Sequence, residues 1–160
     1  MMRKKQILDT SQDSQAAAQL EWLNLNTLAQ VEFSSESPEY PIEEALEVEG
    51  GKGWRSALPG KQSIRIVFDT PQTIHKIFLL FEENVQARTQ EFVLRYLSAG
   101  KESFHNIVLQ QYTFSPPHTT NQLEVYQVDL TNVQILELEI IPDINTSNAF
   151  ASLKKLKLSS

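Results

Sequence analysis

The segment Gln62–Glu83 carries the clearest alternation of apolar and polar positions in the chain. Ile64, Ile66 and Phe68 fall on one side of an extended strand, and the polar residues between them fall on the other. The alternation stops at Thr70–Thr73, where a proline fixes φ and removes a backbone donor, so a turn is expected there. This first arm is therefore predicted to be a strand with one solvent-exposed face.

The second arm of the same segment, Ile74–Phe81, is apolar at nearly every position. Such a run fits a strand covered on both faces, and its periodicity alone also allows a buried helix. Its length and its β-branched content favour the strand. A half-exposed strand joined by a hairpin to a fully covered one requires a second layer of structure above it.

Alternating runs separated by turn residues continue along the rest of the chain. They predict further strands over residues 28–34, 90–97, 104–114, 123–130, 133–141 and 152–158. Together with the two arms of the central segment, about eight strands are typical of an all-β fold, an antiparallel β-sandwich or barrel. No alternation of strands with helices is visible, so a parallel α/β sheet is not expected.

The N-terminal residues follow a different pattern. Residues 1–13 predict a flexible tail, and residues 14–160 a single domain. Ser14–Leu23 contains helix formers, and the apolar residues Leu20, Trp22 and Leu23 predict a short helix that packs on the body of the domain. An arm that binds a partner is the less favoured interpretation.

Length and composition limit the classes of protein that fit. The chain has 160 residues and 41% hydrophobic residues, enough for one domain with a core. Its net charge of -6 disfavours nucleic-acid binding, and it has no cysteine for disulfides or thiolate chemistry. The basic start of residues 1–10 is not followed by the apolar region of a signal peptide. No run approaches the roughly 18 apolar residues of a membrane span, so we expect a cytoplasmic protein.

The order of short and long connections predicts which end of the sandwich carries a site. Strands linked by hairpins alternate in direction, so the turns at 70–73, 98–102 and 131–132 fall at one end. The long connections then gather at the opposite end, which we call the upper end: 35–61, 82–88, 115–121 and 142–148. Binding groups concentrate on loops that a rigid scaffold holds. The alternative is that these loops gather there without any ligand.

Side chains in these loops suit a polar ligand. Trp54 offers a flat face for a sugar ring or a cation, and Arg55 and Arg88 offer planar sets of donors. Acidic residues would accept hydrogen bonds from hydroxyl groups, and a tyrosine and a histidine would each add a ring edge. The predicted ligand-binding residues are Trp54, Arg55, Glu82, Arg88, Tyr112, His118 and Asp143.

Structural interpretations of the same residues stay open. Trp54 could equally close the top of the sandwich, and Arg88 could pair with Glu82 or Glu91 as a structural bridge. His118, between prolines and threonines, could be a solvated loop residue.

Motifs for catalysis and metal binding are missing from the sequence. The three histidines lie on different predicted elements, and no HExxH or CxxC motif is present, so no metal site is predicted. The glycine-rich run 50–53 does not lie between a strand and a helix, and no GxSxG motif occurs. Adjacent carboxylates such as Glu82 and Glu83 are more simply explained as solvated charges. We therefore do not expect an enzyme.

Several short motifs resemble a known family. Pro41–Leu46, Gly53–Ala57 and Gln62–Asp69 look like the opening of a discoidin or coagulation-factor type C domain, and Ala149–Leu158 resembles its last strand. Three further runs resemble an uncharacterised bacterial branch of carbohydrate-binding-like proteins: Arg88–Phe92, Gln110–Pro116 and Ile141–Asp143. The similarity covers about residues 20–160, and it implies a galactose-binding-like jelly-roll sandwich.

The resemblance also implies where ligands bind. In that family the loops at one end bind sugars, phospholipid or protein, and many members hold a structural calcium. Their calcium sites use an Asp-Gly pair and an acidic residue near the last strand, where this chain has Glu49-Gly50 and Lys154. A lysine repels a cation, so calcium is not expected. Phe150 is the only large apolar residue expected on a loop tip, so membrane insertion is not expected either.

We therefore expect a non-catalytic β-sandwich, with a short N-terminal helix and no cofactor, that binds carbohydrate through its upper loops. The alternative is a protein-interaction or assembly module without a small-molecule ligand. That alternative predicts an exposed apolar patch around Trp22 and a non-monomeric mass in solution. The ligand and the oligomeric state are left open by the sequence.

Overall fold

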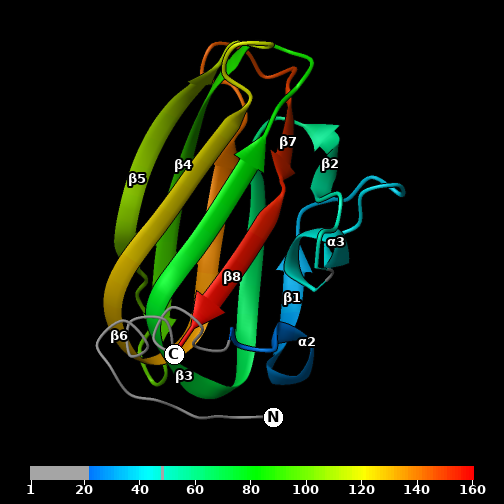
Figure 1. Ribbon diagram of the computed structural model, residues 1–160. Coiled ribbons are helices and arrows are strands. Elements are labelled where there is room, and N and C mark those ends of the chain that lie inside the picture. The colour runs from blue at the N-terminus through cyan, green and yellow to red at the C-terminus, as the bar shows by residue number, and fades with distance from the viewer. Residues whose placement is uncertain (1–21, 48) are drawn as a thin grey trace, which may run out of the picture.

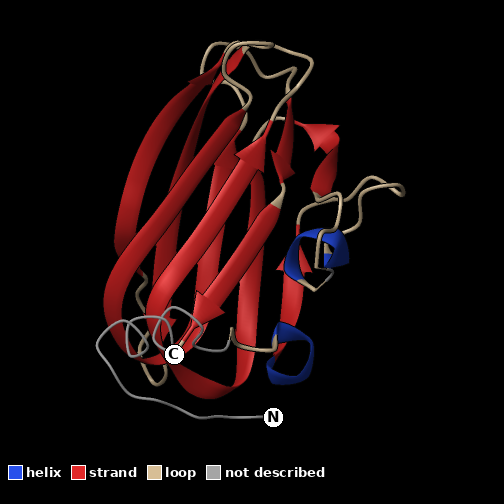
Figure 2. Cartoon of the chain, in the orientation of Figure 1, coloured by secondary structure: helices blue, strands red, loops and turns tan. Residues whose placement is uncertain are grey.

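The computed structural model describes residues 22–47 and 49–160, which form a predominantly β structure (Figures 1 and 2). The described residues hold two one-turn helices and eight strands. In chain order these are α2 Leu25–Leu28, β1 Ala29–Phe33, α3 Glu43–Leu46, β2 Trp54–Pro59, β3 Gln62–Glu82, β4 Arg88–Ser98, β5 His105–Phe114, β6 Asn121–Ile141, β7 Phe150–Leu153 and β8 Lys155–Ser159. The predicted all-β fold of about eight strands is confirmed.

Two long strands, β3 and β6, connect the two layers of the sandwich. Each is 21 residues long and curves around the lower end of the molecule in Figure 1. Residues 62–67 of β3 pair with 135–140 of β6 in one layer, and residues 74–82 pair with 121–130 in the other. Irregular register between these two stretches marks the bend.

The chain reverses its direction at residues 70–73 and 131–132, as predicted. The predicted hairpins there are wrong, however, because the two arms on either side of each turn do not pair with each other. The two arms of β3 face each other across the core and do not bond edge to edge. The reason is that each arm buries one side of its strand, with Ile64, Ile66 and Phe68 on one arm and Ile74 and Phe81 on the other. The outer face of the second arm is only partly covered, whereas full coverage was expected.

Every ladder in the described residues is antiparallel, as predicted. One layer has the order β1, β3, β6, β4, β5, and in the other β8 lies beside the second arm of β3. β2, which the sequence pattern did not predict, pairs with β7 in a separate two-stranded sheet. The predicted strand over 152–158 is divided between β7 and β8, and the result is an antiparallel jelly-roll sandwich (Figure 1).

The predicted tail over 1–13 and most of the predicted helix over 14–23 lie outside the described residues. Trp22 and Leu23 are described, and they are extended along β8 instead of helical. Trp22 forms an isolated bridge with Ser159, and the Leu23 N–H donates to the Leu158 carbonyl over 2.7 Å. Among the helices of the described chain, none is long and apolar enough to cross a membrane.

Candidate functional site

Backbone hydrogen bonds join the long connections at the upper end of the molecule, as predicted (Figure 1). The Glu83 N–H after β3 donates to the Thr120 carbonyl after β5 over 2.8 Å. The Ile144 N–H after β6 donates to the Thr89 carbonyl at the start of β4, also over 2.8 Å. The connection over 35–61 reaches the same end only through β2, because its first part runs along the side of the sandwich.

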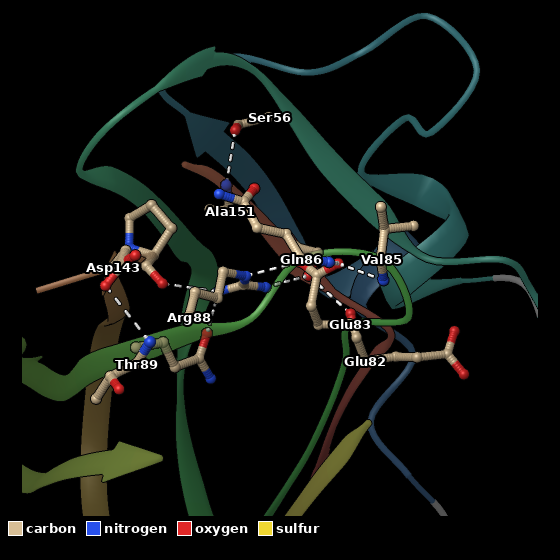
Figure 3. A network of polar contacts seen from close by, with 12 residues as sticks. Ser56, Glu82, Glu83, Val85, Gln86, Arg88, Thr89, Asp143 and Ala151 are labelled. Carbon is tan, nitrogen blue, oxygen red and sulfur yellow. Dashed lines mark hydrogen bonds and ion pairs between the residues drawn. The ribbon is translucent and has the colours of Figure 1, made fainter. Parts of the chain in front are cut away.

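Arg88 lies in the interior of this end, and its side chain is 0% exposed. Its guanidinium donates to Glu83 Oε1 over 2.7 Å, to the Pro142 carbonyl over 2.9 Å and to Ser152 Oγ over 3.0 Å (Figure 3). A fourth bond of 3.2 Å goes to Gln90 Oε1. Because these bonds occupy most of its N–H groups, Arg88 links the start of β4 to the connections after β3 and β6 and to β7.

Glu83 completes this buried pair. Its second oxygen, Oε2, accepts hydrogen bonds from the N–H groups of Val85 and Gln86 at 3.0 and 3.1 Å (Figure 3). Burial by itself would raise the pKa of Glu83, but the bonds from Arg88 and from those two N–H groups outweigh it and hold the pKa below its ordinary value. Glu83 is therefore an ionised structural partner of Arg88.

Of the two interpretations of Arg88, the structure favours the bridge, although with Glu83 in place of Glu82 or Glu91. The Arg88 Cζ also lies 4.9 Å from the centre of the Phe114 ring. No N–H group of this guanidinium points to solvent, so the predicted contact of Arg88 with a ligand has no open path in this structure.

Trp54 is a core residue, with 1% of its surface exposed. It begins β2 opposite Leu153 of β7, and its Nε1–H donates to the Ser35 carbonyl over 3.0 Å. The preceding Gly53 has a φ of 91°, and a Cβ there would lie 2.9 Å from the Leu153 carbonyl oxygen. The close packing of β2 on β7 removes the indole face from solvent, which corrects the expectation that Trp54 stacks on a sugar.

The other predicted residues have local roles or lie apart. The Glu82 carboxylate points away from the Arg88 network in Figure 3 and lies 3.7 Å from Lys154 Nζ. Asp143 is buried and accepts hydrogen bonds from backbone N–H groups of Thr89 and Asn145 at 3.4 and 3.1 Å. Tyr112 and His118 fit no common site with them: Tyr112 packs edge-on against Phe114, and His118 is exposed in the turn after β5.

A cavity of about 480 Å³ opens beside Glu83, between the 35–57 region, the 83–87 connection and β7. Of the seven predicted residues, only Arg55 lines it. Three further lining residues, Tyr40, Gln86 and Phe150, were not predicted as ligand contacts. Its wall is held in place by Ser56, whose Oγ accepts the Ala151 N–H over 3.0 Å (Figure 3).

Arg55 occupies this cavity without an acidic partner among the described residues. Its Cζ lies 4.8 Å from the centre of the Tyr40 ring, so the guanidinium makes a cation–π contact with this ring. Its backbone N–H donates to the Tyr40 carbonyl over 3.1 Å, which fixes the position of β2 against the loop. The guanidinium donors of Arg55 are therefore available to a ligand.

Phe150, at the start of β7, is 48% exposed on the same cavity. Phe150 was expected to be the only large apolar residue on a loop tip, and this expectation is wrong. Val85 and Ile144 are exposed on the upper connections as well, at 83% and 45%. Phe150 and Arg55 are 95 residues apart in the sequence, and the pairing of β2 with β7 brings the two together.

The residues at the family's calcium positions do not fit a calcium ion. The Glu49 carboxylate accepts a hydrogen bond from Lys157 Nζ at 3.1 Å, which lowers the pKa of Glu49, and Lys154 is next to Glu82. Calcium needs six to eight oxygen ligands. Among the described residues, no group of three or more acidic or histidine side chains is placed to hold a metal ion.

A separate apolar surface lies on the outer face of the β8 side of the sandwich. Leu123 and Val125 of β6 are 58% and 47% exposed, and they pair in register with Leu80 and Phe78 of β3. The Trp22 ring packs edge-on against Phe78, with the ring centres 6.1 Å apart. Leu123 and Val125 therefore expose apolar surface beside the strand on which Trp22 packs, while Lys157 Nζ lies 5.5 Å from the centre of the Trp22 ring.

Solved structures of other proteins share this architecture. No family model matches the sequence, and no curated protein does. Solved structures match its fold, including the family 32 carbohydrate-binding module of NanJ from C. perfringens in complex with galactose. That module is 12% identical with a TM-score of 0.63, and the match covers 87% of this chain and 98% of the module.

Two further solved structures show the same similarity. An F5/8 type C domain from Bacteroides fragilis is 15% identical with a TM-score of 0.57, over 87% of this chain and 95% of that domain. A family 29 fucosidase from Ruminococcus gnavus is 11% identical with a TM-score of 0.64; the match covers 86% of this chain but only 26% of the fucosidase. The chain therefore has the galactose-binding-like fold of discoidin and coagulation-factor type C domains, as its motifs indicated.

Proposed function

We propose that this protein is a non-catalytic carbohydrate-binding module whose sugar site is the cavity beside Glu83. The observation that carries the proposal is one open cavity lined by an exposed Phe150 and by Arg55, which has no acidic partner within residues 22–47 and 49–160. The solved structures that share the fold include a galactose-binding module, which supports this class of ligand.

The cavity has the physical properties that a sugar requires. Its volume of about 480 Å³ lies within the roughly 300–1,000 Å³ range of small-molecule sites. The ring of Phe150 can pack against the apolar C–H face of a pyranose. Arg55 and the side-chain amide of Gln86 supply donors for hydroxyl oxygens, and the amide also supplies an acceptor.

A glycan array probed with the wild-type protein and with Phe150→Ala tests this proposal. We expect the wild type to bind a defined set of glycans and the variant to lose at least tenfold in affinity for them. Phe33→Ala is the matched control, because Phe33 is an aromatic residue of β1 that is 38% exposed and does not line this cavity. No binding by the wild type, or equal losses in both variants, would contradict the proposal.

A protein-interaction or assembly module is the second candidate, and the exposed Leu123 and Val125 near Trp22 favour it. It predicts a non-monomeric mass by light scattering, and a monomer with or without residues 1–27 would count against it.

The cytoplasmic location, the absence of membrane insertion and the extent of the domain over 14–160 stay predictions.

A further inference from the structure

Two cationic side chains lie over the ring of Tyr40, and one of them, Arg55, lines the cavity. Lys52 Nζ lies 5.1 Å and Arg55 Cζ 4.8 Å from the centre of the Tyr40 ring. In the described part of the chain, neither side chain makes an ion pair with a carboxylate. On the cavity, the Arg55 guanidinium therefore has no counterion among the described residues, and an anionic group placed beside it would be stabilised.

This arrangement is unusual for this protein, which has a net charge of -6. The structure describes four arginines, and the other three each bond to a glutamate. Arg65 lies 2.6 Å from Glu137, Arg88 lies 2.7 Å from Glu83, and Arg95 lies 2.9 Å from Glu137. The chain has an excess of acidic residues, yet Arg55 lines the cavity without a carboxylate partner among the described residues. This points to a ligand that supplies the carboxylate.

Three acidic residues on or near this region bond to other groups instead. Glu83 lines it, but its two oxygens are occupied by Arg88 and by the N–H groups of Val85 and Gln86. Glu44 Oε1 accepts the backbone N–H of Lys52 over 3.0 Å, which leaves the Lys52 ammonium group to other partners. Glu36 similarly accepts the Ile42 N–H over 2.9 Å.

We infer that the ligand is an acidic sugar, with its carboxylate held by Arg55 and its ring packed on Phe150. This inference depends on the proposed function. A guanidinium binds a carboxylate through two parallel N–H bonds, whereas a single hydroxyl oxygen matches only one of them. The charge-assisted contact therefore discriminates an acidic sugar from its neutral counterpart, and a hexuronic acid or a sialic acid would each supply the carboxylate.

The test uses pairs of glycans that differ only in charge: uronic-acid oligosaccharides with their methyl esters, and sialylated glycans with their carboxyl-methylated forms. We expect the wild type to bind the acidic member of one pair at least tenfold more tightly than its methylated form. The pair that shows this difference identifies the class of acidic sugar. Arg55→Gln should remove this preference and lower affinity for the acidic glycan at least tenfold. Lys52→Gln should lower it less, and Lys101→Gln in the distant β4–β5 turn should change nothing.

The outcomes separate the inference from the proposed function. Tighter binding of the acidic member, lost in Arg55→Gln, supports both. Equal binding of both members, or a preference for the neutral one, overturns the acidic-sugar inference and leaves a carbohydrate-binding module standing. No binding of any glycan overturns both.

Discussion

Arg88 bonds to Glu83 and Arg55 lines the same cavity as Glu83, but the surroundings of the two arginines differ in one decisive way. The Arg88 side chain is fully buried, its charge is neutralised by Glu83, and it makes four hydrogen bonds to the protein. Arg55 lies on an open cavity against the Tyr40 ring, without a carboxylate in the described chain. A charge with every partner supplied by the protein stabilises the fold, and a charge without one is available for recognition.

The largest expected effect follows from breaking the buried pair. Arg88→Met should lower the free energy of unfolding by about 3–5 kcal/mol, because the Glu83 charge would be left buried without compensation. Urea unfolding measures this loss. The double variant Arg88→Met/Glu83→Leu should recover part of it, since both charges are then removed together. A single variant as stable as the wild type would show that the pair is not structural.

Trp54→Phe tests whether Trp54 belongs to the buried region. Losing the indole N–H leaves the partly buried Ser35 carbonyl without its partner, which should cost about 1 kcal/mol in the free energy of unfolding. Glycan binding by the folded variant should be unchanged. If stability is unchanged and binding is lost, Trp54 contacts the ligand and the burial of its ring does not hold in solution.

The pH dependence of stability should report the Glu83–Arg88 pair. The pKa of Glu83 is lower in the folded protein than its ordinary value of 4.5, so the unfolded chain takes up the proton first as pH falls. The stabilisation is therefore complete above about pH 5 and is lost as the pH falls through the folded pKa. Urea unfolding from pH 7 to pH 3 should show this loss in the wild type, and a smaller one in Glu83→Gln. Identical pH profiles would contradict it.

The smallest effect on stability is expected at Arg55. Arg55→Gln should change the free energy of unfolding by less than about 0.5 kcal/mol, because the side chain makes no hydrogen bond or ion pair in the described protein. The same variant should lose glycan binding. A stability loss like that of Arg88→Met would show that Arg55 has a structural partner instead of a ligand.

Much of the fold could be predicted from local patterns. Alternation found the arms of β3 and β6, and the turn residues found where each arm ends. The pairing of arms could not be read from alternation, because a strand that bends into a second layer has the same local pattern as a hairpin. β2 was missed because it is short and pairs with β7 over a long separation, with Trp54 opposite Leu153, and the break between β7 and β8 was missed because both are short.

The candidate site shows the same limit. The order of connections correctly predicted that the connections after β3, β5 and β6 gather at one end, and residue type alone selected both Arg55 and Arg88. Their different roles depend on Glu83, which the sequence analysis interpreted as a solvated charge but which lies buried against Arg88. Phe150 was not selected because its neighbours in the cavity, Tyr40 and Arg55, are distant in sequence.

A backbone-amide NMR titration of the wild type with the tightest-binding glycan of the array tests the central claim most directly. The largest chemical-shift changes should fall on the amides around the cavity, at residues 37–40, 55–57, 85–86 and 150–151. Changes confined to residues 115–120 and 142–147, with the cavity amides unmoved, would contradict the claim that the sugar binds beside Glu83.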